Sequence, residues 1–202
     1  LLCGNALFGE SVKHKITVDE KQVLQDVETE GNRLFLFYDD SSVEIHDMSN
    51  GKTVGRTYSL FGADREKYFR TSVLLKHGNK IYQIRNARSD GGILQEYDIN
   101  AGTFKMMMEL PYTMAGMAVF NDILYVASQY GYWKCNLKDG TKEHVEYLML
   151  DDGTKLYTDI NAILFDKQGG MWIGTQKRGL LYAKQFPSPF YSYHWSDPRY
   201  RE

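Results

Sequence analysis

Histidine and acidic residues are the side chains of this sequence that could hold a metal ion. The five histidines are widely separated and form no HxxxH or HExxH spacing; they are His14, His46, His77, His144 and His194. The acidic stretches Asp39-Asp40 and Asp151-Asp152-Gly153 lack the alternating carboxylates of an EF-hand loop. We interpret these acids as solvated turn residues and expect no metal and no cofactor.

The residues that could act as nucleophiles are equally isolated. Cys3 and Cys135 belong to no CxxC motif or Cys/His cluster, and no GxSxG elbow is present. Paired carboxylates for sugar hydrolysis would have to be brought together by the fold, which spacing alone does not indicate. We therefore expect a protein that is not an enzyme, with a propeller lyase or glycosidase as a distant alternative.

The chain contains a repeated unit of strands and turns, on which any site would be built. Four segments share a tight Gly, Asn or Asp turn followed by a dense apolar strand, with equivalent positions at Leu34, Ile81, Leu124 and Trp172. A strand precedes each turn, a third strand follows, and three of the units continue through a Gly turn into a fourth strand. Four short antiparallel strands at a spacing of 43 to 48 residues are typical of β-propeller blades.

The second strand of each unit is apolar on both faces, as in Leu34–Tyr38. A strand with one solvated face would show polar residues at every second position. The pattern therefore predicts inner strands covered on both sides by neighbouring blades, and more polar outer strands such as Thr141–Tyr147. No segment has a sustained 3.6-residue period, so we expect little helix.

The predicted fold is all-β and propeller-like, with about four four-stranded antiparallel blades in one domain over residues 10–202. The blades are expected near residues 16–60, 68–110, 112–150 and 157–195. Residues 1–9 are apolar and small, and we interpret them as a signal-peptide remnant, with a first buried strand as the alternative. This interpretation favours a periplasmic or secreted protein.

Charge and hydropathy exclude two classes of partner. The net charge is −2 and basic residues are spread along the chain, which argues against nucleic-acid binding. No segment reaches the roughly 18 consecutive apolar residues of a membrane span. Because an open set of four blades would expose the apolar faces of its end blades, we expect self-association into a dimer or contact with further blades.

The predicted site lies in the loops that join second to third strands, because these loops share one face of a propeller. The candidate residues are Tyr38, Asp39, Asp40, Arg85, Asn86, Arg88, Gln129, Tyr130, Gln176, Lys177 and Arg178. Their aromatic, amide, carboxylate and guanidinium groups suit the hydroxyls of an oligosaccharide, another small ligand or an acidic partner. An ordinary polar rim is the alternative interpretation.

Residues 159–193 resemble the repeat of two-component-regulator propellers. The resemblance is carried by Asp166, the Gly169-Gly170 turn, Trp172-Ile173-Gly174-Thr175 and Gly179-Leu180. It implies the periplasmic sensor region of hybrid two-component systems of Bacteroidetes, a binding module associated with carbohydrate. A structural scaffold that assembles through exposed blade edges is the alternative. The three earlier units lack Trp-x-Gly-Thr.

Overall fold

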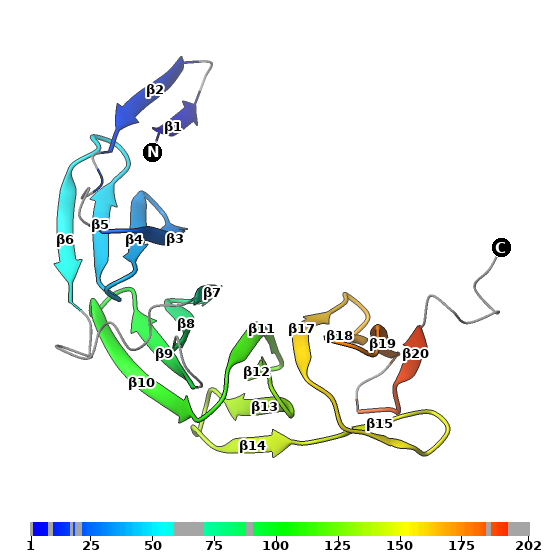
Figure 1. Cartoon of the computed structure of the whole chain (residues 1–202). Coiled ribbons are helices and arrows are strands. Elements are labelled where there is room, and N and C mark those ends of the chain that lie inside the picture. Colours follow the sequence, from blue (N-terminus) through cyan, green and yellow to red (C-terminus); the bar gives the residue numbers. More distant parts are fainter. Residues whose placement is uncertain are drawn as a thin grey trace. The chain divides into compact units, whose positions relative to one another are not determined.

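The computed structural model of the chain describes residues 2–7, 10–16, 18, 22–58, 71–87, 91–184 and 187–193. The chain divides into two compact units, one of residues 1–89 and 93–109 and one of residues 90–92 and 110–202. Each unit holds two four-stranded antiparallel sheets (Figure 1). Gly92 and Leu110, at strand ends of the first unit's sheets, are the two strand residues assigned to the other unit. The predicted all-β fold of four propeller-like blades is confirmed.

The first unit contains the first two blades, whose strands pair in chain order. The first blade consists of β3 (Leu24–Glu30), β4 (Arg33–Tyr38), β5 (Val43–Asp47) and β6 (Thr53–Thr57). The second consists of β7 (Thr71–His77), β8 (Lys80–Asn86), β9 (Gly92–Asp98) and β10 (Thr103–Leu110). A hairpin of β1 (Leu2–Leu7) and β2 (Glu10–Lys15) precedes them. The signal-peptide interpretation of residues 1–9 stays a prediction; residues 1, 8 and 9 lie outside the described residues.

The second unit contains the third and fourth blades. The third consists of β11 (Met114–Phe120), β12 (Ile123–Ser128), β13 (Gly131–Asn136) and β14 (Lys142–Val145). The fourth consists of β17 (Ile160–Phe165), β18 (Met171–Thr175), β19 (Leu180–Ala183) and β20 (Tyr191–Tyr193). A short hairpin of β15 (Leu148–Met149) and β16 (Lys155–Leu156) lies between the blades in the chain. The described residues contain no helix, and hence none long and apolar enough to cross a membrane.

The turn between third and fourth strands repeats in three blades at the level of single hydrogen bonds. Each turn ends at a glycine with positive φ whose N–H donates to the carbonyl oxygen four residues earlier. The three pairs are Gly51 with Asp47, Gly102 with Asp98 and Gly140 with Asn136, at 2.8, 2.8 and 2.9 Å. The recurrence of one bonding pattern shows that the sequence repeat is also a structural repeat.

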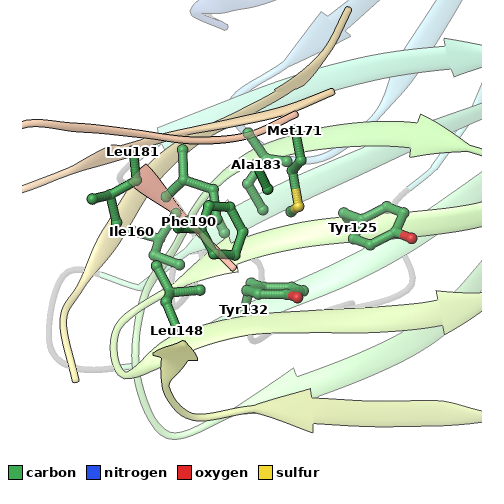
Figure 2. Close-up of a cluster of buried hydrophobic side chains, with 11 residues drawn as sticks. Tyr125, Tyr132, Leu148, Ile160, Met171, Leu181, Ala183 and Phe190 are labelled. Atoms are coloured by element: carbon green, nitrogen blue, oxygen red, sulfur yellow. The ribbon is translucent and has the colours of Figure 1, made fainter. Parts of the chain in front are cut away.

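The core of each unit lies along its inner strands. From their second residues onward β4, β8 and β12 are buried on both faces, as the continuous apolar pattern predicted. In the first unit, the Tyr97 ring meets both Phe35 and Phe37 edge-on, with centroids 6.1 Å apart in each pair. Figure 2 shows the core of the second unit, where Tyr125 and Tyr132 of the third blade pack with Met171 and Leu181 of the fourth.

The equivalent position in the fourth blade is Met171, and the predicted alignment on Trp172 is wrong by one residue. The N–H of Gln129 donates to Thr113 O at 3.2 Å, and the N–H of Gln176 makes the same bond to Asp159 O at 3.1 Å. Counting back equally from these two glutamines leads to Leu124 and Met171, which are both fully buried.

A longer turn in the fourth blade causes this shift. In the third blade Phe120 pairs directly with Ile123, whereas in the fourth Phe165 pairs with Met171, so more residues lie within the turn. Trp172 therefore aligns with Tyr125, on the opposite face of the strand from Met171. The sequence alone does not show how many residues of the turn lie outside the strand pairing, so it does not fix this alignment.

Asp166 organises that turn through hydrogen bonds and also binds the side chain of Trp172. Its carboxylate accepts hydrogen bonds from the N–H groups of Gly170 (2.8 Å) and Gln168 (3.0 Å), from Trp172 Nε1 (3.2 Å) and from the Tyr182 hydroxyl (3.2 Å). These donors, with Gly170 first, lower the pKa of Asp166. Trp172 also stacks on Tyr182 of the neighbouring strand, with centroids 4.2 Å apart. This contact lies within the sheet of the fourth blade.

Candidate ligand-binding site

The second unit contains a groove of about 700 Å³, here called the tyrosine groove because three of its seven lining residues are tyrosines. Its lining residues are Tyr112, Tyr130, His144, Glu146, Tyr157, Thr158 and Asp159. They come from the segment before β11, the β12–β13 loop, the end of β14 and the segment before β17. Because antiparallel strands alternate in direction, these four segments meet at the same edge of the sheets.

A row of rings forms one wall of the groove. Tyr112 and Tyr130 are perpendicular, with ring centroids 5.6 Å apart. His144 lies between Tyr112 and Trp133, with centroids 6.4 and 4.6 Å away. The indole Nε1 of Trp133 donates to the Tyr112 hydroxyl at 3.2 Å. Each ring is thus held by at least one neighbour, which pre-organises the wall.

Backbone contacts hold the β12–β13 loop against the segment before β17. The Gly131 N–H donates to Thr158 O at 3.0 Å, and the Tyr130 N–H donates to Asp159 Oδ1 at 3.2 Å. Tyr130 has φ +65°, and Gly131 has φ +97°. A Cβ on Gly131 would lie 2.0 Å from Val145 O, so only glycine allows the loop to lie this close to the end of β14.

Two tyrosine rings of the groove are largely solvent-exposed. The exposed fractions are 57% for Tyr130 and 64% for Tyr157. Tyr157 contacts Tyr147 at a centroid distance of 5.6 Å, and the Lys155 ammonium lies 4.3 Å from the centre of the Tyr147 ring. Exposed aromatic rings beside a concavity are typical of ligand-binding surfaces.

Besides the three tyrosine hydroxyls, the ionisable groups that line the groove are two carboxylates and one imidazole. Glu146 is exposed and its Oε1 lies 3.8 Å from His144 Nδ1. Asp159 is half-buried, and within the described part of the chain its Oδ2 has no hydrogen-bond partner. No group of three His, Cys, Asp or Glu residues among those described is arranged to hold a metal ion.

A smaller polar cavity of about 210 Å³ adjoins the groove at Asp159. Its lining residues are Thr113, Ala115, Gln129, Asp159, Ile160, Asn161 and Gln176. Gln129 and Gln176, predicted as site residues on separate loops, are therefore brought to one cavity. The Gln129 side chain also donates to the Tyr130 hydroxyl at 3.3 Å.

The predicted residues of the first unit are largely buried. Tyr38, Arg85 and Asn86 lie in the interior, and Asp39 and Asp40 are partly buried. Arg85 is fully buried and its guanidinium donates to the carbonyl oxygens of Tyr38, at 3.1 Å, and of Asp39. Arg88 lies outside the described residues. These side chains join the first two blades and leave little surface for a ligand, so the prediction of a rim here lacks support.

Burial explains the electrostatics of Arg85. Desolvation lowers the pKa of the guanidinium to about 10, against the opposing effect of the nearby Asp39 and Asp40 carboxylates. Arg85 therefore stays charged at neutral pH, and hydrogen bonds compensate its buried charge. Tyr38 is similarly engaged, since its hydroxyl donates to Glu44 Oε2 at 2.9 Å.

The remaining predicted residues of the second unit do not lie in one site. Tyr130 lines the groove, whereas Lys177 and Arg178 are exposed and line neither cavity. The sequence prediction missed six groove residues: Tyr112, His144, Glu146, Tyr157, Thr158 and Asp159. The available signal was the concentration of aromatic residues near 130–133, 144–147 and 157. Residues 141–147 were interpreted as an outer strand alone.

Residues 155–177 match the family described as two component regulator propeller. The fourth blade carries this family's repeat. The matched two component regulator propeller segment runs from β16 to just beyond β18, and it includes Tyr157, Thr158 and Asp159 of the groove. Part of the groove is therefore built from the family repeat itself.

Three solved structures are similar in fold to this chain at low sequence identity. The computationally designed Ika4 protein has a TM-score of 0.58 and 10% identity, covering 85% of this chain and 96% of that one. The designed Ika8 protein has a TM-score of 0.53 and 12% identity, covering 83% and 48%.

The third structure is the extracellular domain of the putative one component system BT4673 from B. thetaiotaomicron. Its TM-score is 0.60 at 15% identity, with 93% of this chain covered and 24% of that one. The chain thus spans about half of the Ika8 protein and about a quarter of the BT4673 domain. Comparison with curated proteins gave no match.

Proposed function

We propose that the chain is a non-catalytic sensing module of the periplasm or cell exterior that binds an oligosaccharide in the tyrosine groove. The observation that carries this proposal is the exposure of Tyr130 and Tyr157 in a groove of about 700 Å³. Aromatic faces pack against the apolar C–H faces of sugar rings, and carboxylate and hydroxyl oxygens accept hydrogen bonds from sugar hydroxyls. Thr158 and Asp159 supply such oxygens beside the rings.

The comparisons support the sensing role and the location. The fourth blade carries a two component regulator propeller repeat, and a similar fold occurs in the extracellular domain of a putative one component system. The first description names a regulator, and the second names an extracellular domain of such a system. The groove shares three residues with the matched repeat, which links the proposed binding site to the family.

The chemistry of the described residues is consistent with binding alone. Burial raises the pKa of the Cys135 thiol to about 11, so this thiol is protonated at neutral pH and a poor nucleophile. One of the two carboxylates of the groove, Asp159, has a direct role in structure, because it accepts a hydrogen bond from the Tyr130 N–H.

A carbohydrate-binding experiment tests the proposal. Titration calorimetry with neutral and charged oligosaccharides should detect a ligand, and Tyr157→Ala should weaken its binding at least about tenfold through lost stacking. Tyr191→Ala is the matched control, because Tyr191 is also exposed but lies on β20 outside the groove. Binding that survives Tyr157→Ala and Tyr130→Ala unchanged, or no binding by any oligosaccharide, would contradict the proposal.

A second candidate function is assembly through the outer face of the fourth blade. Leu164, Trp172, Tyr182 and Tyr191 are directly paired across β17–β20 and form one apolar row. On this face of the fourth blade, Leu164 is 62% exposed. On the same face of the third blade, Tyr125 occupies the position equivalent to Trp172 and is only 3% exposed, because the fourth blade covers it. The equivalent face of the third blade thus binds a blade, which supports docking of another blade or a second copy here.

Light scattering distinguishes this candidate. We expect a dimer whose dissociation constant rises at least about tenfold in Leu164→Asp, because a charge is placed in the buried interface. Val54→Asp, at an exposed apolar residue of β6, should leave the mass unchanged. A monomeric protein at micromolar concentration would exclude dimerisation through this face.

A further inference from the structure

The charge of the groove narrows the class of its ligand. We infer that the groove selects an oligosaccharide with protonated amino groups, such as unacetylated amino sugars, over neutral and acidic ones. This inference rests on the proposed function of the groove as a carbohydrate site. It concerns which sugars bind there.

The carboxylates are the first argument. Glu146 and Asp159 both line the groove, and neither lysine nor arginine is among its lining residues. The Glu146 side chain is exposed and lies beside the open volume of the groove. Because Oδ2 of Asp159 has no partner within the described residues, it is available as an acceptor for an ammonium donor.

The tyrosine faces are the second argument. A cation over a tyrosine ring is attracted by the negative π face, and Tyr130 and Tyr157 present the two most exposed rings of the groove. The neighbouring Tyr147 already binds a cation in this way, since the Lys155 ammonium lies 4.3 Å from its ring centre. The same group of rings thus accommodates an ammonium within the protein itself.

Repulsion supplies the selectivity against acids. A uronic-acid or sulfated sugar would place its anion near Glu146 and Asp159, with no arginine or lysine in the lining to compensate. Two other ionisable groups lie close by: His144, whose Nδ1 is 3.8 Å from Glu146, and Lys155, which is positioned over Tyr147 outside the lining. These two groups together do not outnumber the two carboxylates.

The experiment compares three tetrasaccharides by titration calorimetry: one of glucosamine, its fully N-acetylated form and one of galacturonic acid. The titrations are made at about pH 6, roughly two units below the pKa of an α-amino group, so that the sugar amines are largely protonated. We expect the glucosamine form to bind roughly fivefold more tightly than the acetylated form, and the galacturonate form to bind most weakly. The preference should shrink as salt is raised, because the groove is open to solvent.

Variants connect this preference to the groove. Glu146→Gln keeps the shape and removes the charge, so it should reduce the preference for the amine at least about twofold and leave the acetylated form's affinity unchanged. Glu143→Gln is the matched control, because Glu143 precedes the groove on β14 and its carboxylate binds Lys134 at 2.9 Å. Circular dichroism establishes that each variant is folded.

The outcomes separate the two proposals. Equal or tighter binding of the acetylated or galacturonate form, or a preference that Glu146→Gln leaves intact, overturns the inference on charge while the sugar site stands. Absence of binding by all three, with no other oligosaccharide bound, overturns the sugar site and the inference together.

Discussion

The backbone N–H of Tyr130 donates to Oδ1 of Asp159, 3.2 Å away, and this bond joins the third blade to the segment that leads into the fourth. Tyr130 adopts φ +65°, a conformation that a non-glycine residue occupies at some energetic cost, and the bond helps to hold it there. One of the two carboxylates of the groove therefore also fixes the position of one of its two exposed rings. Binding and local stability are coupled at this pair.

Replacing the carboxylate should show this coupling. Asp159→Ala removes the acceptor of the solvent-exposed Tyr130 N–H and should lower the free energy of unfolding by roughly 1 kcal/mol. Ligand affinity should fall as well, because Tyr130 is no longer held. Urea unfolding followed by tyrosine fluorescence measures the first effect. Asp151→Ala, at an exposed turn acid, should stay within about 0.5 kcal/mol of the parent.

Gly131→Ala should disrupt the same loop more strongly. The new Cβ would meet Val145 O at 2.0 Å in a residue with φ +97°, so the loop must move away from the end of β14. We expect a loss of about 2–4 kcal/mol in unfolding free energy. Gly140→Ala is the control: its φ is +76°, yet nothing lies within 4 Å of its Cβ, so only about 1 kcal/mol should be lost. Equal effects of the two substitutions would contradict the role given to the close approach.

Removal of the buried guanidinium should destabilise the first unit. Arg85→Met leaves the carbonyl oxygens of Tyr38 and Asp39 without this donor, and we expect a loss of about 3 kcal/mol. Differential scanning calorimetry should show a lower transition temperature. The exposed Arg178→Met should leave the transition within about 1 °C of the parent. A similar response to both substitutions would show that Arg85 does not join the blades.

Asp98 should make the first unit sensitive to acid. The Lys80 ammonium, at 2.7 Å, and the N–H groups of Ala101 and Asn100 lower the pKa of Asp98 to about 2 from its ordinary value of 3.8. A carboxyl with a lowered folded-state pKa stabilises fully above its unfolded-state pKa, and this stabilisation is lost as pH falls from about 4 to 2. Stability should therefore decline across that range.

Asp98→Asn tests the assignment, because it removes this carboxyl at every pH. The variant should be less stable than the parent near pH 7, and the difference should shrink as pH falls toward about 2. Denaturant midpoints measured at several pH values provide the comparison, with Asp151→Asn as the control. A difference that stays constant across the range would show that the acid sensitivity arises elsewhere.

Local chemistry was sufficient for the sequence to determine the repeat. Gly51, Gly102 and Gly140 mark turns that require positive φ, and the apolar runs beginning at Leu34, Ile81 and Leu124 mark strands covered on both faces. Both signals depend on neighbours along the chain, so they can be recognised without coordinates. The motif around Trp172, where a family model also matches, could likewise be recognised, since Asp166, Gly170 and Trp172 act within a single turn.

The residues that form the groove could be identified only from the tertiary structure. Tyr112, Tyr130 and Tyr157 are separated along the chain and meet because β11 and β17 begin, and β12 ends, at one edge of neighbouring sheets. Arg85 shows the converse, since a charged residue beside a predicted loop is buried by carbonyl groups of another blade. Strand pairing fixes which loops share an edge, and packing between blades fixes which polar side chains are buried. Both depend on contacts between residues far apart in the chain, which a repeat pattern does not specify.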